Sequence, residues 1–115
     1  MVQAYVEQLT DLMMRAASRK HRDVRLEIKH FFSGAAVYAN GAICITLTPV
    51  GFALKLPPER RTVLLEKHGG TTLRYFPKAP IKKEYAVLPA SIMDSRNALR
   101  GWVAESIDYV TLATK

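Results

Sequence analysis

Two tight turns constrain the fold of this chain more than any other feature of its sequence. The segment Phe31–Leu56 alternates apolar residues with small or polar ones and is interrupted at Asn40-Gly41 and again at Pro49-Val50-Gly51. Both central residues of a type I′ turn need positive φ, which Asn and Gly adopt easily, so Asn40-Gly41 predicts a hairpin. Short hairpin loops join antiparallel neighbours. We therefore expect three consecutive antiparallel strands between Phe31 and Leu56.

Alternation within this segment assigns side chains to the two faces of the predicted sheet. One face carries bulky residues that belong under helices: Ile43, Ile45, Leu47, Phe52, Leu54 and Leu56. The opposite face carries small or polar residues: Ala42, Cys44, Thr46, Ala53 and Lys55. We expect this second face to be less thickly covered. Cys44 is expected to be a small packed residue on it, because nothing nearby in the sequence would lower the pKa of its thiol.

Three helices are predicted around these strands. Apolar residues recur at three- and four-residue spacing over 2–19, which predicts an amphipathic helix. A second helix opens at Pro57-Pro58-Glu59 and ends at Gly69-Gly70, where a left-handed φ is available. The third runs to Leu112 from an N-cap at Ser91 or Asp94.

The remaining segments complete the predicted sheet. Thr71–Phe76 and Glu84–Leu88 have the pattern of two further strands, and Val24–His30 alternates with period two. The sequence leaves open whether residues 24–32 form a separate strand. Gly101 interrupts the last helix beside Trp102, and we expect it to allow close approach to the sheet. The order helix, three strands, helix, two strands, helix predicts an α+β fold in two layers, with an antiparallel sheet of about five strands.

Length and composition restrict the class of protein. The 115 residues predict one domain over residues 1–115. The longest apolar runs are far shorter than the roughly 20 residues that span a bilayer, and the first residues lack the pattern of a secretory signal. A single cysteine excludes an intramolecular disulfide and is typical of a reducing compartment. We therefore expect a cytoplasmic protein with no membrane partner.

No pattern of residues predicts catalysis. A glycine-rich phosphate loop is missing from the sequence, because Gly69-Gly70 stands at a helix end without a following lysine. The three histidines, His21, His30 and His68, fall on different predicted elements without the spacing of a metal site. We expect a non-enzymatic protein with no catalytic residue, metal ion or cofactor.

The net charge of +7 is the compositional feature that bears most on function. Such a charge favours nucleic acid or an acidic partner. The best candidates for nucleic-acid contact are Arg60 and Arg61 on the second helix, with Lys78, Lys82 and Lys83 in and after the following hairpin loop. Acidic residues are interleaved with the basic ones, and no helix-turn-helix, zinc finger or aromatic RNA-binding signature is present. A solvated basic rim is therefore favoured over dedicated nucleic-acid binding.

A set of residues along nearly the whole chain carries a family resemblance. The set is Phe32-Ser33-Gly34, Tyr38, Gly41, Phe52-Ala53-Leu54-Lys55, Gly69 or Gly70, Tyr85, Pro89 and Trp102. In this order and spacing it resembles the amino-terminal domain of the TfoX/Sxy family of competence regulators, although Ser33 replaces the glycine that is usual there. The resemblance implies a fold of the secretion-chaperone type. Full-length regulators carry a second, C-terminal domain that is not found here, so a stand-alone N-terminal domain is expected.

Two functions remain open at this point. The first is a regulatory or protein-interaction domain with an unknown partner, acting through the less covered sheet face or an exposed strand edge. Its candidate partner-binding residues are Tyr38, Cys44, Lys55 and Arg74. The alternative is a nucleic-acid-associated protein that binds DNA or RNA through the basic rim. The resemblance also implies pairing of protomers, so we expect a weak or moderate homodimer through that face or a strand edge, the alternative being a monomer.

Overall fold

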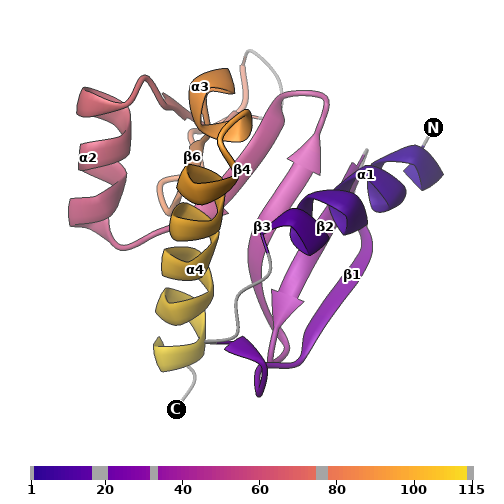
Figure 1. The fold of residues 1–115 in the computed structure, drawn as a ribbon. Coiled ribbons are helices and arrows are strands. Elements are labelled where there is room, and N and C mark those ends of the chain that lie inside the picture. The colour runs from indigo at the N-terminus through magenta and orange to yellow at the C-terminus, as the bar shows by residue number, and fades with distance from the viewer. Residues whose placement is uncertain (1, 17–20, 32–33, 75–77, 114–115) are drawn as a thin grey trace.

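The computed structural model describes residues 2–16, 21–31, 34–74 and 78–113 (Figure 1). The first half contains α1 (Val2–Arg15), β1 (Leu26–Phe31), β2 (Gly34–Ala39), β3 (Ala42–Thr48) and β4 (Gly51–Lys55). The second half contains α2 (Pro58–Lys67), β5 (Thr71–Thr72), β6 (Tyr85–Val87), α3 (Ala90–Met93) and α4 (Arg96–Ala113). No helix in these ranges is both long enough and apolar enough to cross a membrane.

The strands form one antiparallel sheet in the order β1-β2-β3-β4-β6-β5. Two long helices cover one face of it: α1 packs on β1 and β2, and α4 packs on β3 and β4 (Figure 1). Helix α2 stands beside the sheet and contacts β6. The prediction of an α+β fold with an antiparallel sheet is confirmed. The described residues form six strands and four helices, where the sequence predicted about five strands and three helices.

The two predicted turns are present, and the question about residues 24–32 is answered. Asn40 and Gly41 have φ values of 51° and 85°, as a type I′ turn requires. Residues 26–31 form a strand of their own, β1, which pairs with β2 in unbroken register from Leu26 opposite Ala39 to Phe31 opposite Gly34. Gly34 is needed at this point, because an added Cβ would lie 2.0 Å from the Leu47 carbonyl oxygen. Four strands therefore precede α2, not three.

A β-bulge changes the predicted faces of β3. Val37 of β2 lies opposite Ile45, but the next residue, Tyr38, lies opposite Ile43, so Cys44 is an extra residue in the ladder. The side chain of Cys44 consequently enters the core beneath the helices, where it is fully buried, and Ile43 shares the opposite face with Tyr38. Ala42 lies opposite the core residue Ala39 and also faces the helices. The predicted faces of Ala42, Ile43 and Cys44 are therefore wrong, because strict alternation does not allow for an inserted residue. The hydroxyl of Ser106 on α4 donates to the Cys44 carbonyl at 3.0 Å and links the bulge to the helix layer.

The C-terminal helix is broken, which the sequence did not indicate. Helix α3 ends at Met93, and α4 begins two residues after Asp94. The hydroxyl of Ser95 accepts a hydrogen bond from the Ala98 N–H at 3.3 Å, so Ser95 caps α4 where Ser91 or Asp94 was predicted.

Two further boundaries differ from the predictions. The predicted strand Thr71–Phe76 is paired only over Thr71–Thr72, and Tyr75 and Phe76 lie outside the described residues. Helix α1 ends at Arg15 and not at Arg19, and residues 17–20 also lie outside the described part of the chain. The predicted start of α2 is confirmed, because Pro58 occupies the first helical turn.

The core lies between the sheet and the two long helices. Its members include Leu9, Met13, Val37, Ile45, Leu54, Leu64, Leu99, Trp102, Val103 and Ile107. Trp102 is only 7% exposed, which confirms its predicted burial. Gly101 is exposed, and no atom lies within 4 Å of the position that a Cβ would take. The predicted close approach of Gly101 to the sheet is therefore wrong.

Candidate functional site

The sheet face opposite α1 and α4 is the first candidate surface. We call it the outer face and define it by Lys29, Ala36, Tyr38, Ile43, Thr46, Ala53, Lys55, Tyr85 and Val87, which the register places on that side. In its centre the register aligns Ala36, Thr46 and Ala53 across three strands. All three are fully buried, although neither α1 nor α4 packs on this side. The outer face therefore has a centre of small side chains between larger ones.

Two lysine–tyrosine pairs flank this centre. The Lys29 ammonium lies 5.1 Å from the centroid of the Tyr38 ring, and the Lys55 ammonium lies 5.8 Å from that of Tyr85. Lys55 also lies 3.6 Å from a carboxylate oxygen of Glu84. Cation–π contacts of this kind contribute about 0.5–1 kcal/mol at exposed sites. They hold each tyrosine ring and its lysine together at the border of the outer face.

Two of the four predicted partner-binding residues, Tyr38 and Lys55, lie on the outer face. Cys44 does not, because the bulge turns it into the core. Arg74 does not either: it follows the short strand β5, and its guanidinium donates to the Ala79 carbonyl at 3.0 Å within the loop before β6. The prediction for Arg74 assumed a strand through Phe76, and β5 stops at Thr72.

Thr46 is the most unusual residue of the outer face. Its side chain is fully buried, and Oγ1 has no hydrogen-bond partner among the described residues. A buried hydroxyl without a partner costs about 1–3 kcal/mol of desolvation. Alternation placed Thr46 on this face but gave no reason to select it, because its burial depends on the neighbouring strands. Lys29 was also missed, although the period-two pattern of Val24–His30 contains a signal for it.

Arg60, a predicted nucleic-acid contact, is instead part of the helix packing. Its Nε and Nη2 donate to the two carboxylate oxygens of Glu105 on α4, at 2.5 and 3.1 Å. Its guanidinium also lies 4.9 Å from the centroid of the Trp102 ring. The hydrogen bonds to Glu105 raise the pKa of Arg60 further above its ordinary value. Arg60 therefore joins α2 to α4 and does not contribute to a basic rim.

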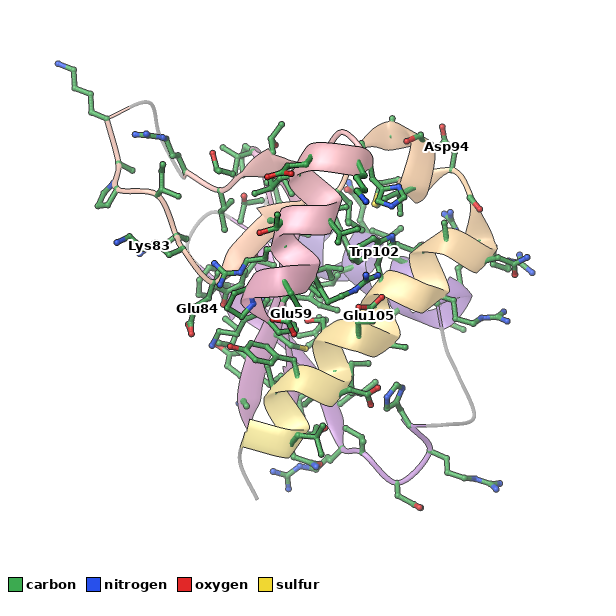
Figure 2. All side chains as sticks on the ribbon, turned by 90° about the vertical axis from the view of Figure 1, so that its left-hand side faces the viewer. Glu59, Lys83, Glu84, Asp94, Trp102 and Glu105 are labelled. Carbon is green, nitrogen blue, oxygen red and sulfur yellow. The ribbon has the colours of Figure 1, made fainter. Side chains whose placement is uncertain are left out.

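On its other side, α2 borders a cavity of about 350 Å³. We call it the basic hollow; it is lined by Pro58, Arg61, Thr62, Leu65, Thr72, Ile81, Lys82, Lys83 and Tyr85. Figure 2 shows Lys83 on the opposite side of α2 from Glu105 and Trp102. Three of the five predicted nucleic-acid contacts meet here, and no carboxylate occurs among the residues that line the hollow in the described part. Lys78 is exposed in the preceding loop and does not line it.

The described nucleophilic and metal-ligating residues that the sequence singled out are buried or lie apart from one another. Burial raises the pKa of the Cys44 thiol to about 12, so this thiol is protonated at neutral pH. His21 contacts Asp108 at 2.8 Å, and His68 packs edge-on against Trp102 at 5.6 Å. Within the described ranges, no three His, Cys, Asp or Glu side chains are placed to hold a metal ion.

Comparison with known proteins gives one result that bears on the family. Neither the search of curated proteins nor that of solved structures found a match. The model of the TfoX N-terminal domain matches residues 21–110, which includes all six strands and most of α4. This chain therefore belongs to the TfoX N-terminal domain family.

Proposed function

We propose that this domain is a non-enzymatic protein-interaction module of a regulatory kind, and that its partner docks on the outer face. The observation that carries the proposal is the exposure of the outer face, which α1 and α4 leave uncovered. The half-buried side chains of Tyr38, Ile43 and Tyr85 lie there around a centre of small, fully buried residues. A partner that packs on these aromatic and aliphatic side chains would remove their exposed surface from water.

The surroundings of Thr46 have the composition of an interface. Tyr38 and Tyr85 provide aromatic area on either side of the small central residues, and tyrosine is enriched at protein interfaces. Lys29 and Lys55 lie at the border of the face with the carboxylates of Glu27 and Glu84, so charges of both signs are available to orient a partner. The regulatory part of the proposal rests on the family, because the model of the TfoX N-terminal domain matches residues 21–110 of this chain.

Site-specific photo-crosslinking tests this proposal. A photoreactive amino acid at position 38 is expected to give a discrete adduct in an extract of the source cell. The matched control places it at Met14, which is 73% exposed on α1, outside the outer face. A second change, Ala53→Arg, fills the centre of the outer face and should abolish the adduct at position 38, while circular dichroism verifies that the variant is folded. The proposal is wrong if position 38 gives no adduct, or if Ala53→Arg leaves the adduct unchanged.

The basic hollow supports a second candidate function, the binding of nucleic acid. The observation in its favour is the meeting of Arg61, Lys82 and Lys83 around one cavity. It ranks second because Arg60 is held by Glu105. A polarisation titration with single-stranded and duplex DNA at several salt concentrations tests it. If the hollow binds phosphate groups, the double variant Lys82→Ala/Lys83→Ala should reduce the slope of log affinity against log salt concentration by about two. Lys78→Ala, which lies outside the hollow, should leave this slope unchanged. Equal slopes for all three proteins would exclude the hollow.

A further inference from the structure

Strand β1 forms a long and regular border of the sheet. It has six residues without proline or glycine, and its register with β2 is unbroken. No strand in the described part of the chain pairs with its outer side. The opposite border, β5, has only two residues, and just beyond it the Leu73 carbonyl accepts a hydrogen bond from the Lys82 N–H at 2.9 Å. Unpaired edges of this length are templates for another strand, so β1 is the edge at which the sheet could be extended.

The hydrogen-bond pattern shows which groups of β1 are available. The Asn40 N–H donates to the Arg25 carbonyl at 2.8 Å, which directs the backbone groups of Arg25 toward β2. In an antiparallel pair every second residue directs both its N–H and its C=O group toward the facing strand. Glu27 and Lys29 therefore also form backbone hydrogen bonds with β2. Leu26, Ile28 and His30 then direct their N–H and C=O groups away from the sheet.

We propose that β1 pairs antiparallel with β1 of a second copy of this chain, with Ile28 on the two-fold axis. In this register the backbone N–H and C=O groups of Ile28 form hydrogen bonds with those of the partner's Ile28. The backbone groups of Leu26 form hydrogen bonds with those of the partner's His30. The backbone groups of all three outward-directed residues are then paired in both copies. If the axis passed through Leu26, five of the six residues of β1 would extend beyond the end of the partner strand, and if it passed through His30, three would.

The charges of β1 favour the same register. With Ile28 on the axis, Glu27 lies opposite the partner's Lys29, and the symmetry produces this pair twice. Both positions are of the type without direct backbone bonds, at which facing side chains approach most closely. In the single chain Glu27 makes only a 3.7 Å contact with Arg25, whose side chain is 74% exposed, and Lys29 is exposed above Tyr38. Both side chains can therefore turn toward a partner strand.

This inference does not depend on the proposed function. The contact uses the edge of the sheet, and it leaves the centre of the outer face and the basic hollow open. Two copies would form one continuous sheet whose outer faces lie on the same side. The contact is small, so we expect a dissociation constant on the order of 10–100 µM.

Charge exchange across the proposed contact provides the test. Glu27→Lys and Lys29→Glu each place like charges opposite one another at both pairs, and each should weaken self-association by at least about tenfold. Glu27→Lys/Lys29→Glu exchanges the charges within each pair and should restore it. A mixture of the two single variants should form a heterodimer, because every facing pair is then of opposite sign. Lys78→Glu, which changes charge outside β1, is the matched control.

Sedimentation equilibrium of these proteins up to several hundred micromolar gives the result. We expect a concentration-dependent mass for the natural sequence, for the double variant, for the equimolar mixture and for the control. A single species of 12.9 kDa at every concentration for the natural sequence would overturn the proposal. So would a dimer that the single variants do not weaken, since that dimer would use another surface. Crosslinking from position 38 to a partner protein can succeed or fail independently of either outcome.

Discussion

Arg60 and Glu105 form a two-point ion pair between helices α2 and α4, although they are 45 positions apart in the chain. Trp102 lies one helical turn before Glu105, and its ring faces the same guanidinium at 4.9 Å. One arginine of α2 is therefore occupied in holding the helices together, while its neighbour Arg61 lines the basic hollow. The Nε of Arg61 donates to the Leu56 carbonyl at 3.1 Å, so both arginines are hydrogen-bonded within the fold.

The Arg60 contacts predict a measurable loss of stability. Arg60→Ala should lower the free energy of unfolding by about 1–2 kcal/mol, because it removes a partly exposed ion pair and a cation–π contact. Urea unfolding of Arg60→Ala, Glu105→Ala and the double variant gives the coupling energy, which we expect at about 0.5–1 kcal/mol. Additive effects of the two substitutions would show that the pair contributes nothing.

Trp102 should be among the most sensitive positions of the core. Trp102→Ala is expected to reduce the free energy of unfolding by about 3–5 kcal/mol, since it leaves a cavity between α4 and its neighbours. Because Trp102 is the only tryptophan, the transition has to be followed by circular dichroism and not by tryptophan fluorescence. A loss below about 1 kcal/mol would contradict its place in the core.

Replacement by alanine should change the stability of the protein in opposite directions at two glycines. Gly101 lies on an exposed helical surface with free space at its Cβ position, so Gly101→Ala should stabilise the protein by up to about 1 kcal/mol. Gly34→Ala places a Cβ against the Leu47 carbonyl and should be strongly destabilising. Thermal unfolding of both variants checks the pair of expectations, and a lower melting temperature for Gly101→Ala would contradict the first.

The buried thiol of Cys44 predicts a specific dependence of stability on pH. Below pH 9.0, its ordinary pKa, the thiol is protonated in both the folded and the unfolded protein. Between pH 9.0 and about 12 only the unfolded chain ionises. Rising pH therefore favours unfolding, with a slope of at most about 1.4 kcal/mol per pH unit from this group.

Cys44→Ala lacks this contribution and serves as the comparison. The stability advantage of the natural sequence over Cys44→Ala should shrink as the pH rises from 8 toward 11, measured by urea unfolding. At pH 8 the thiol should react with a disulfide reagent only as fast as the protein opens. Rapid labelling of the folded protein would contradict the burial of Cys44.

The sequence contained enough information for the main architecture, because the decisive signals were local. Asn40-Gly41 specified its turn through positive φ, Pro58 marked the start of α2, and the apolar spacing around Trp102 indicated the buried side of α4. Each of these features depends on residues close in the chain.

The features that the sequence did not reveal depend on contacts between distant segments. The bulge at Cys44 breaks alternation without a proline or glycine to mark it, and its carbonyl is bonded by Ser106 of α4. The Arg60 side chain is held by Glu105, and no rule based on sequence spacing connects these two residues. Among the candidate residues, Tyr38 and Lys55 were placed on the outer face by period-two alternation, while Cys44 and Arg74 were misplaced where that alternation failed.

Helix α1 lies wholly before residue 21, at which the family match begins. Its Leu9 and Met13 are nevertheless core members, and the helix packs on β1 and β2. The stretch that identifies the family and the stretch that folds are thus of different length. A fragment cut at the family boundary would leave the apolar side of two strands open to water, and a fragment of that kind is expected to aggregate even though it retains every residue by which the domain is recognised.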